Sequence, residues 1–453
     1  MEVIGIRTAS LGDTTYIIGL GDHAIVVDPQ RDIGRFLDIL DERGLTLTHV
    51  LETHMHNDYI SGGRDLARRT GADLVLPAAS GAGFAFVAAF HGESLDGPGS
   101  CIIEPVHTPG HTPAHTSYLI RPADGLPGAG AVFTGGSLLV GAAGRSDLLG
   151  DAYARQLAVL QFGSLQRLAT FPDDTGVYPT HGEGSFCTAS GAGRTTSTIG
   201  IEKAENPLFT FTDAEAFADD QLSGLVPYPT YYQHMGGINR NGPTAFVGGT
   251  IRNLDPVEVA AHLTSGGAVL DGRSRDEFAA GHIPGSIGIE IGDSFAPWAG
   301  WLLDFDAPIV LVLGADQDAD AAVVELGRIG LEDVIGVLRG VAAWGDEGRD
   351  LNHYKNASSA DLSLALAADA GLQVLDVRDP LEWAAGHVEG SIHRYLPDLA
   401  SGLPEELSTT EPVWVICRTG NRASIAAGIL ESFGLDLVVV AKGGVPDLEA
   451  GGP

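Results

Sequence analysis

The sequence predicts a multidomain protein of mixed α+β and α/β class, in which an αββα sandwich precedes two smaller α/β domains. Three observations lead to this prediction. The chain has 453 residues, more than one hydrophobic core usually organises. A segment near residue 270 recurs near residue 375, so the second half contains a duplicated unit. The first 245 residues instead combine short, glycine-punctuated strands with helices. We therefore expect domains at residues 1–245, 250–350 and 356–453.

Within the first domain, apolar runs predict short strands at residues 16–18 and 24–27. Helices are expected at residues 33–43 and 64–70. This mixture indicates a sheet sandwich that carries helices on its outside. A segment rich in Pro, Tyr and Gly, residues 227–243, is expected to be a loop that faces a site.

The duplicated unit appears as two matching runs, GHIPGSI at residues 281–287 and GHVEGSI at residues 386–392. In each copy an apolar strand precedes a helix-forming stretch, and a second strand follows at residues 309–313 or 413–416. Strands that alternate with helices are typical of a parallel sheet. Residues 348–356 are polar and without periodicity, which suits a linker between the copies.

The charge balance argues against two classes of partner. Fifty-nine acidic residues against 26 basic ones give a formal charge of −33, which repels nucleic acid and anionic lipid surfaces. No apolar run reaches the ~18 residues that cross a bilayer. The first residues resemble neither a secretory signal nor a transit peptide, so a cytoplasmic location is expected.

The three cysteines are too few for a disulfide framework and are expected to be free thiols. Cys101 lies in an apolar run and is predicted to be a core residue. Cys187 follows the segment around His181, where it can line a pocket, but a packing role is favoured.

Three separate segments carry histidines that can converge on a metal. His54, His56 and Asp58 are spaced two residues apart on an extended segment, so their side chains point to one side. His111 and His181 lie in glycine-flanked turns, where side chains can be aimed inward. Each histidine alone is an ordinary surface or core residue, and the cluster carries the signal.

Cys417 lies between a predicted buried strand at residues 413–416 and a predicted helix at residues 423–433. Backbone N–H groups of such a turn point inward, and the helix N-terminus adds partial positive charge, so a thiolate or persulfide is stabilised there. We predict Cys417 as the catalytic nucleophile and Arg422 as a catalytic residue beside it. The persulfide loop between them comprises Arg418, Thr419, Gly420 and Asn421. The two arginines are expected to attract an anionic sulfur donor.

The spacing of this loop favours sulfur over phosphate. Phosphatase-like and arsenate-reducing loops place one more residue between cysteine and arginine, and that next position here is Ala423. With its upstream motifs at residues 376–378, 382–383 and 386–387, the last domain resembles the rhodanese family. Aligning the copies puts Leu313 at the position of Cys417, and Asp318 at that of Arg422, so the first copy is expected to be catalytically inactive.

The HxHxD and PGHT motifs resemble the metallo-β-lactamase fold, specifically its persulfide dioxygenase branch, which is often fused to rhodanese domains. The resemblance implies one mononuclear metal, iron(II) before zinc, bound by His54, His111 and an aspartate of a TGD motif. The sequence departs from this pattern at Gly136, which stands where the aspartate is expected. It departs again at Tyr59, where the general fold has a histidine, so a two-metal site is disfavoured.

The ligands that remain are His54, His56 and His111, expected to form a three-histidine face around one metal. Asp58 and His181 are expected nearby, as partners of the ligands or as further ligands. Asp147 is a candidate to replace the missing carboxylate. A degenerate site without useful metal affinity is the alternative.

The expected function is a persulfide dioxygenase and sulfurtransferase of sulfide detoxification, which oxidises a thiol persulfide such as that of glutathione to sulfite and transfers sulfur through Cys417. Two alternatives stay open: a non-oxidising rhodanese with a degenerate metal domain, and a hydroxyacylglutathione-type thioester hydrolase. The expected partners are small molecules, namely a thiol persulfide, thiosulfate or sulfite, and a homodimer is compatible with the sequence. Tyr231, Tyr232 and Arg240 are weak candidates for contacting the thiol carrier, with loop packing the favoured role.

Overall fold

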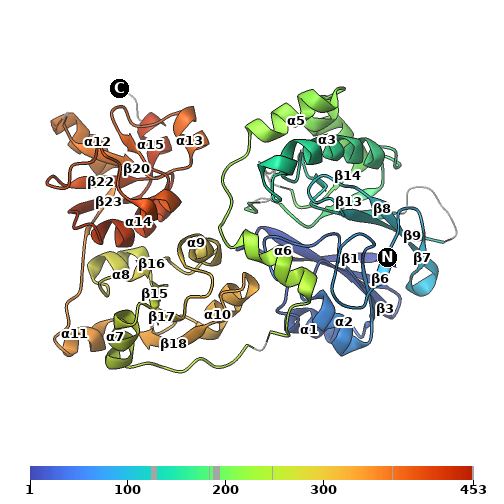
Figure 1. The fold of residues 1–453 in the computed structure, drawn as a ribbon, viewed down its shortest axis with the longest axis horizontal. Coiled ribbons are helices and arrows are strands. Elements are labelled where there is room, and N and C mark those ends of the chain that lie inside the picture. Colours follow the sequence, from blue (N-terminus) through green and yellow to red (C-terminus); the bar gives the residue numbers. More distant parts are fainter. Residues whose placement is uncertain (124–129, 183, 187–193, 247, 370, 451–453) are drawn as a thin grey trace. The chain divides into compact units, whose positions relative to one another are not determined.

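The computed structural model describes residues 1–453 except 124–129, 183, 187–193, 247, 370 and 451–453, so Cys187 lies outside the described residues. The chain divides into two compact units (Figure 1). One comprises Met1–Val247 with Arg328–Gly330, and the other comprises Gly248–Gly327 with Leu331–Pro453. Among the described residues, every helix is too short or too polar to span a membrane.

The first unit is the expected sandwich of two six-stranded sheets. The first sheet runs in sequence order: β1 (Glu2–Thr8), β2 (Asp13–Leu20), β3 (His23–Val27), β4 (Thr46–Leu51), β5 (Asp73–Pro77) and β6 (Val87–Ala89). The second has the order β14 (Ser197–Thr198), β13 (Gly176–Pro179), β10 (Ala131–Gly135), β9 (Thr116–Pro122), β8 (Cys101–His107) and β7 (Leu95–Asp96). From β3 to β6 the first sheet is parallel, so the loops after β3, β4 and β5 leave from one edge.

Alternation along the central strands separates the two faces of the first sheet. Ile18 and Ile25 join the core between the sheets, together with Phe133 of the second sheet. Their neighbours Ile17 and Val26 pack on the opposite face, against the outer helices. These helices are α1 (Gly34–Glu42) and α2 (Gly63–Thr70). Cys101 is buried in the core between the sheets, as expected.

The first unit also contains three helices on its second sheet and several short elements. The helices α3 (Asp151–Leu168), α4 (Ile199–Glu205) and α5 (Ala214–Ser223) pack on the second sheet, and α3 and α5 lie side by side (Figure 1). The short elements are η1 (Pro98–Ser100), β11 (Leu138–Leu139), β12 (Ala142–Ala143) and η2 (Pro207–Thr210).

The segment 227–243, expected to be a loop, is largely the helix α6 (Tyr232–Asn241). The loop prediction was wrong for these residues. Tyr232, Met235 and Asn239 are buried, and their spacing places them on one helix face. The glycines at 236 and 237 and the flanking prolines concealed this periodicity in the sequence, because they are typical of turns.

The second unit contains the two α/β copies, each built on a parallel sheet. The first has the sheet order β16-β15-β17-β18, and its elements are α7 (Pro256–Thr264), β15 (Ala268–Asp271), α8 (Arg275–Ala280), β16 (Ile287–Gly288), α9 (Phe295–Leu302), β17 (Ile309–Leu313), α10 (Ala319–Arg328), β18 (Val334–Arg339) and α11 (Ala342–Asp346).

The second copy has the sheet order β19-β23-β22-β20-β21. Its elements are β19 (Lys355–Ser358), α12 (Ser359–Ala368), β20 (Gln373–Asp376), α13 (Pro380–Ala385), β21 (Ile392–His393), η3 (Leu396–Ser401), β22 (Val413–Ile416), α14 (Asn421–Glu431), β23 (Leu437–Lys442) and α15 (Val445–Ala450). The helix α14 begins two residues earlier than expected, at Asn421, which is the last residue of the predicted persulfide loop.

Candidate metal centre and cysteine loop

Five of the predicted metal-site residues meet at one end of the sandwich. His54, His56 and Asp58 follow the parallel strand β4, and His111 and His181 lie in the turns after β8 and β13. All five side chains are buried. The ring centroid of His54 lies 4.1 Å from that of His56, 4.7 Å from that of His111 and 5.3 Å from that of His181. The folded chain therefore brings these distant segments into one cluster.

In His56 and His111 one ring nitrogen is bound to neighbouring protein groups. The other nitrogen, called the inner one here, is available to bind another partner. His111 Nδ1 donates to the carbonyl of Arg145 at 2.8 Å, and His56 Nε2 lies 3.2 Å from carboxylates of both Asp28 and Glu52. The buried His111 Nε2 and His56 Nδ1 find no hydrogen-bond partner among the described residues. This arrangement, with one nitrogen anchored and the other inward, is that of metal-ligating imidazoles. The residues present thus fit a metal.

His181 belongs to the same cluster. One ligand atom each from His54, His111 and His181 lies within 4.8 Å of the others, and His56, Asp58 and His181 form a second such group. His181 Nε2 lies 3.3 Å from His54 Nε2. The predicted ligand face of His54, His56 and His111 stays a prediction, because among the described residues His54 and His111 form such a group with His181 and not with His56.

The electrostatic environment separates the histidines into two kinds. Burial lowers the pKa of His54 well below its ordinary value, and it lowers the pKa of His111 to about 3, so both rings are neutral, as a metal ligand has to be. Burial acts in the same direction on His181, but the carboxylates of Asp58 and Asp13 outweigh it and hold its pKa well above the usual range. His181 Nδ1 lies 2.8 Å from Asp13 and 3.1 Å from Asp58.

Three buried carboxylates around the cluster were missed in the sequence. Asp13 contacts His181, and Asp28 and Glu52 contact His56. Asp28 also accepts hydrogen bonds from the backbone and hydroxyl of Thr53, both at 2.7 Å. The sequence did carry a signal for them, namely acidic residues beside apolar strands. Such a residue is expected to have a partner, because a charged side chain is rarely fully buried without one.

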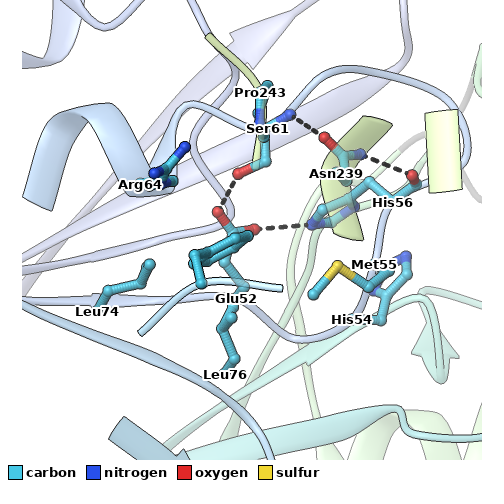
Figure 2. A pocket seen from close by; sticks show the side chains of 11 residues that line it. Glu52, His54, Met55, His56, Ser61, Arg64, Leu74, Leu76, Asn239 and Pro243 are labelled. Carbon is cyan, nitrogen blue, oxygen red and sulfur yellow. Dashed lines mark hydrogen bonds and ion pairs between the residues drawn. The ribbon is translucent and has the colours of Figure 1, made fainter. Parts of the chain in front are cut away.

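Glu52 lies at a small pocket behind His56 (Figure 2). One carboxylate oxygen accepts from the Ser61 hydroxyl, and the other faces His56 Nε2. Asn239 of α6 donates to two backbone carbonyls of the loop that carries His56, those of His56 and Tyr59, both at 2.8 Å. The helix α6 therefore fixes the backbone that carries the predicted ligands.

The ring of His111 fills the space that a side chain at residue 136 would need. A Cβ atom at Gly136 would overlap that ring, so an aspartate there requires His111 to move. Asp147 does not replace the missing carboxylate, because both its oxygens bind the guanidinium of Arg145 at 2.7 Å. That pair instead positions the Arg145 carbonyl, which holds His111.

Tyr59 is fully buried and turned away from the inner nitrogens. Its hydroxyl donates to the Asp28 carbonyl at 3.2 Å and lies 3.0 Å from His56 Nε2. Burial raises its pKa well above the ordinary value, so it stays a neutral phenol. The residue in the place of the second-metal histidine therefore acts as a structural support.

The weak substrate-contact candidates lie on or beside α6. Tyr231 and Tyr232 are buried, and the Tyr231 hydroxyl donates to the Asp58 carbonyl at 3.1 Å. This arrangement agrees with the packing role favoured for them. Arg240 is exposed, so its contact with a thiol carrier stays a prediction.

In the second unit, Cys417 follows β22 and is almost fully buried. Its sulfur accepts from the backbone N–H groups of Gly420 at 3.2 Å and Ala423 at 3.4 Å. The Ala423 amide belongs to the first turn of α14, so its N–H has no earlier helical carbonyl to bind. The expected cradle for a thiolate or persulfide is present.

The remaining loop residues have distinct surroundings. Arg418 and Thr419 are exposed, and Asn421 donates to the Ser294 hydroxyl of the first copy at 2.6 Å. The Arg422 guanidinium binds both carboxylate oxygens of Glu382, at 2.5 and 2.9 Å. The positive charge of Arg422, which was expected to face a sulfur donor, is thus paired with Glu382. In the sequence Glu382 stood out only as part of a motif.

Replacing Gly420 by alanine is expected to destabilise the domain by roughly 3 kcal/mol. Gly420 has φ +90°, and a Cβ there would overlap the Ala441 carbonyl. Gly434→Ala is the matched control, because Gly434 has φ +76° but its Cβ would meet no described atom within 4 Å. That variant should lose about 1 kcal/mol in thermal or chemical unfolding. Equal losses in the two variants would contradict the prediction.

Comparison with known proteins accounts for both halves of this arrangement. Residues 11–181 match the metallo-beta-lactamase superfamily, and residues 255–347 and 359–450 each match the rhodanese-like domain. The chain joins a metallo-beta-lactamase domain to two rhodanese-like domains. The resemblance inferred from the sequence motifs is confirmed, as is the predicted fold class.

Individual relatives support different activities. Hydroxyacylglutathione hydrolase of Methylobacillus flagellatus is 36% identical over 35% of this chain and 58% of its own, so the chain spans little more than half of that relative. Human persulfide dioxygenase ETHE1 is 28% identical over 44% of this chain and 73% of its own. A metallo-beta-lactamase structure from Staphylococcus aureus is 28% identical, with a TM-score of 0.68, and the match covers 75% of this chain and 99% of that one. The relatives that this chain resembles are thus named as a hydrolase, a persulfide dioxygenase and a metallo-beta-lactamase.

The first rhodanese-like domain has no cysteine at the position that matches Cys417. Asp271 pairs with Val312, as Asp376 pairs with Ile416 in the second domain, so Leu313 occupies the position of Cys417. The turn after Leu313 is filled by Gln317, which accepts from the Gly314 amide at 2.8 Å and donates to the Gly272 carbonyl at 2.7 Å. These contacts support the expectation that this domain does not transfer sulfur.

Proposed function

We propose that this protein is a persulfide dioxygenase joined to a sulfurtransferase, which oxidises a low-molecular-weight thiol persulfide to sulfite and carries sulfane sulfur on Cys417. The observation that carries the proposal is the sulfur of Cys417, held by two backbone N–H groups at the start of α14. Such donors stabilise an anionic sulfur without a metal. The buried histidine cluster supports the oxidative half.

In the transfer step the Cys417 thiolate attacks the outer sulfur of the donor. A bond forms between the Cys417 sulfur and that outer sulfur, and the donor's own S–S bond breaks. When thiosulfate is the donor, the leaving group is sulfite. When a thiol persulfide is the donor, the leaving group is a thiolate. The Gly420 and Ala423 amides are placed to hold the persulfide product. Attack of sulfite on the Cys417 persulfide reverses the first case and releases thiosulfate.

In the oxidative step a thiol persulfide, oxygen and water give the thiol, sulfite and two protons. Iron(II) bound by His54, His56 and His111 would supply the redox chemistry for this step. The chain's own contribution is to hold these rings: the Arg145 carbonyl fixes His111, and carboxylates fix His56. Sulfite produced here is the partner that Cys417 persulfide needs to form thiosulfate.

Thioester hydrolysis is a second candidate, favoured by the match to hydroxyacylglutathione hydrolase and by Asp58 and His181, which lie 3.1 Å apart. A hydrolase of this type uses a metal pair. Gly136 supplies no bridging carboxylate, and Tyr59 is a buried neutral phenol in the place of a ligand. We therefore place this activity second, and the non-oxidising sulfurtransferase is the remaining alternative.

Oxygen uptake by the iron-reconstituted protein with glutathione persulfide tests the proposal. We expect uptake with formation of sulfite, in the wild type and in Cys417→Ser alike, because the cysteine belongs to the other compact unit. Iron content and hydrolysis of S-lactoylglutathione are measured on the same samples. Iron-loaded protein that consumes no oxygen but transfers sulfur would indicate the non-oxidising sulfurtransferase, and thioester cleavage would indicate the hydrolase.

A further inference from the structure

The guanidinium of Arg422 is neutralised where it lies. Glu382 binds it through both carboxylate oxygens, and an oxygen of Asp379 lies 3.6 Å from the same guanidinium. All three side chains are largely buried, with exposed fractions of 16%, 22% and 17% for Arg422, Glu382 and Asp379. One positive charge therefore faces two negative ones, and the group as a whole is negative beside the Cys417 loop.

The local sequence fixes the position of Glu382. Asp379 caps α13, and its side chain accepts from the backbone amides of Leu381 at 2.9 Å and Glu382 at 3.0 Å. Pro380 occupies the first helical position, which suits its fixed φ. The cap thus sets the helix turn that carries Glu382 towards Arg422.

The inactive first domain provides an internal comparison. Its Glu277 occupies the position of Glu382, but it folds back on its own cap and binds the Ser274 hydroxyl at 2.6 Å. That domain has Asp318 where the second has Arg422. The glutamate therefore turns to the loop only in the domain that carries both the arginine and the cysteine.

We propose that Glu382, supported by Asp379, determines which sulfur donor Cys417 accepts, by disfavouring thiosulfate and favouring thiol persulfides. This inference rests on the proposed sulfurtransferase function. Thiosulfate is a dianion, and its leaving group, sulfite, keeps two negative charges when the S–S bond breaks. A thiol persulfide leaves a thiolate with one. A site whose arginine is already paired with carboxylates stabilises the second leaving group better than the first. Arg418 is exposed to solvent, which screens its charge.

Donor selectivity is measured as the ratio of kcat/KM for thiosulfate to kcat/KM for glutathione persulfide, with cyanide as the common acceptor. In Glu382→Gln the ratio should rise on the order of 10-fold, because a negative charge is removed beside the loop. Asp379→Asn keeps a capping side chain and should raise the ratio by about 3-fold. Glu277→Gln in the first domain is the matched control and should leave the ratio unchanged.

Added salt supplies a second measurement. It should raise kcat/KM for thiosulfate more in the wild type than in Glu382→Gln, because it screens a negative charge that only the wild type carries beside the loop. A ratio that is unchanged or lower in Glu382→Gln would overturn the inference, as would the same salt response in both proteins. Wild-type protein that transfers sulfur from neither donor would instead refute the proposed sulfurtransferase function.

Discussion

Replacing Cys417 by serine is expected to lower sulfur transfer to cyanide by at least about 1,000-fold, since no hydroxyl can replace the thiolate as the sulfur carrier. The effect should be the same for thiosulfate and for a thiol persulfide, because both donors load the same sulfur atom. Thiocyanate formation measures the transfer. Mass spectrometry of wild-type protein incubated with donor alone should show one added sulfur atom on Cys417.

The matched control is Cys101→Ala, which removes the other described cysteine. Cys101 is buried between the sheets of the first unit, so its loss should leave the rate of transfer unchanged. Retention of substantial transfer by Cys417→Ser would contradict the assignment of the nucleophile. Unaltered oxygen uptake in the same variant would show that the metal domain works without it.

Replacing His111 by alanine is expected to weaken metal binding by at least about 100-fold and to abolish metal-dependent turnover. The buried Nε2 of His111 has no partner among the described residues, and the ring is held by the Arg145 carbonyl. Metal content after dialysis, with competition against a chelator, measures the change. Sulfur transfer by Cys417 should persist, because that cysteine has its own core in the other unit.

His107→Ala is the matched control for this variant. His107 ends the strand that precedes His111, but it is only partly buried and contacts the Pro113 carbonyl at 3.1 Å. Metal content should be the same as in the wild type. If His111→Ala bound metal as tightly as His107→Ala, the histidine cluster would not be the metal centre.

Several parts of the site could be predicted because their signals are local. The two-residue spacing of His54, His56 and Asp58 places them on one side of an extended segment, and glycine-flanked turns direct His111 and His181. The strand, loop and helix around Cys417 are also encoded within about 20 residues, by an apolar run, a glycine and a helical stretch. Such patterns depend on backbone geometry, which acts between near neighbours in the sequence.

The loop prediction for residues 227–243 shows where local signals mislead. Glycines and prolines are typical of turns, but burial of Tyr232, Met235 and Asn239 against the first unit stabilises α6 despite them. Packing of one helix face outweighs a weak intrinsic propensity. The contact of Asn239 with the His56 loop, across more than 180 residues, follows from that packing.

By itself the sequence predicted the duplicated α/β unit, the candidate histidines, Cys417 as the nucleophile and an inactive first copy, because each prediction depends on residue identity at fixed spacing. Only the tertiary structure decided which groups surround them. Asp13 beside His181, Glu52 behind His56 and Glu382 on Arg422 are contacts set by the packing of whole elements. In a buried site such contacts decide charge, since a carboxylate in low dielectric acts strongly on the groups around it.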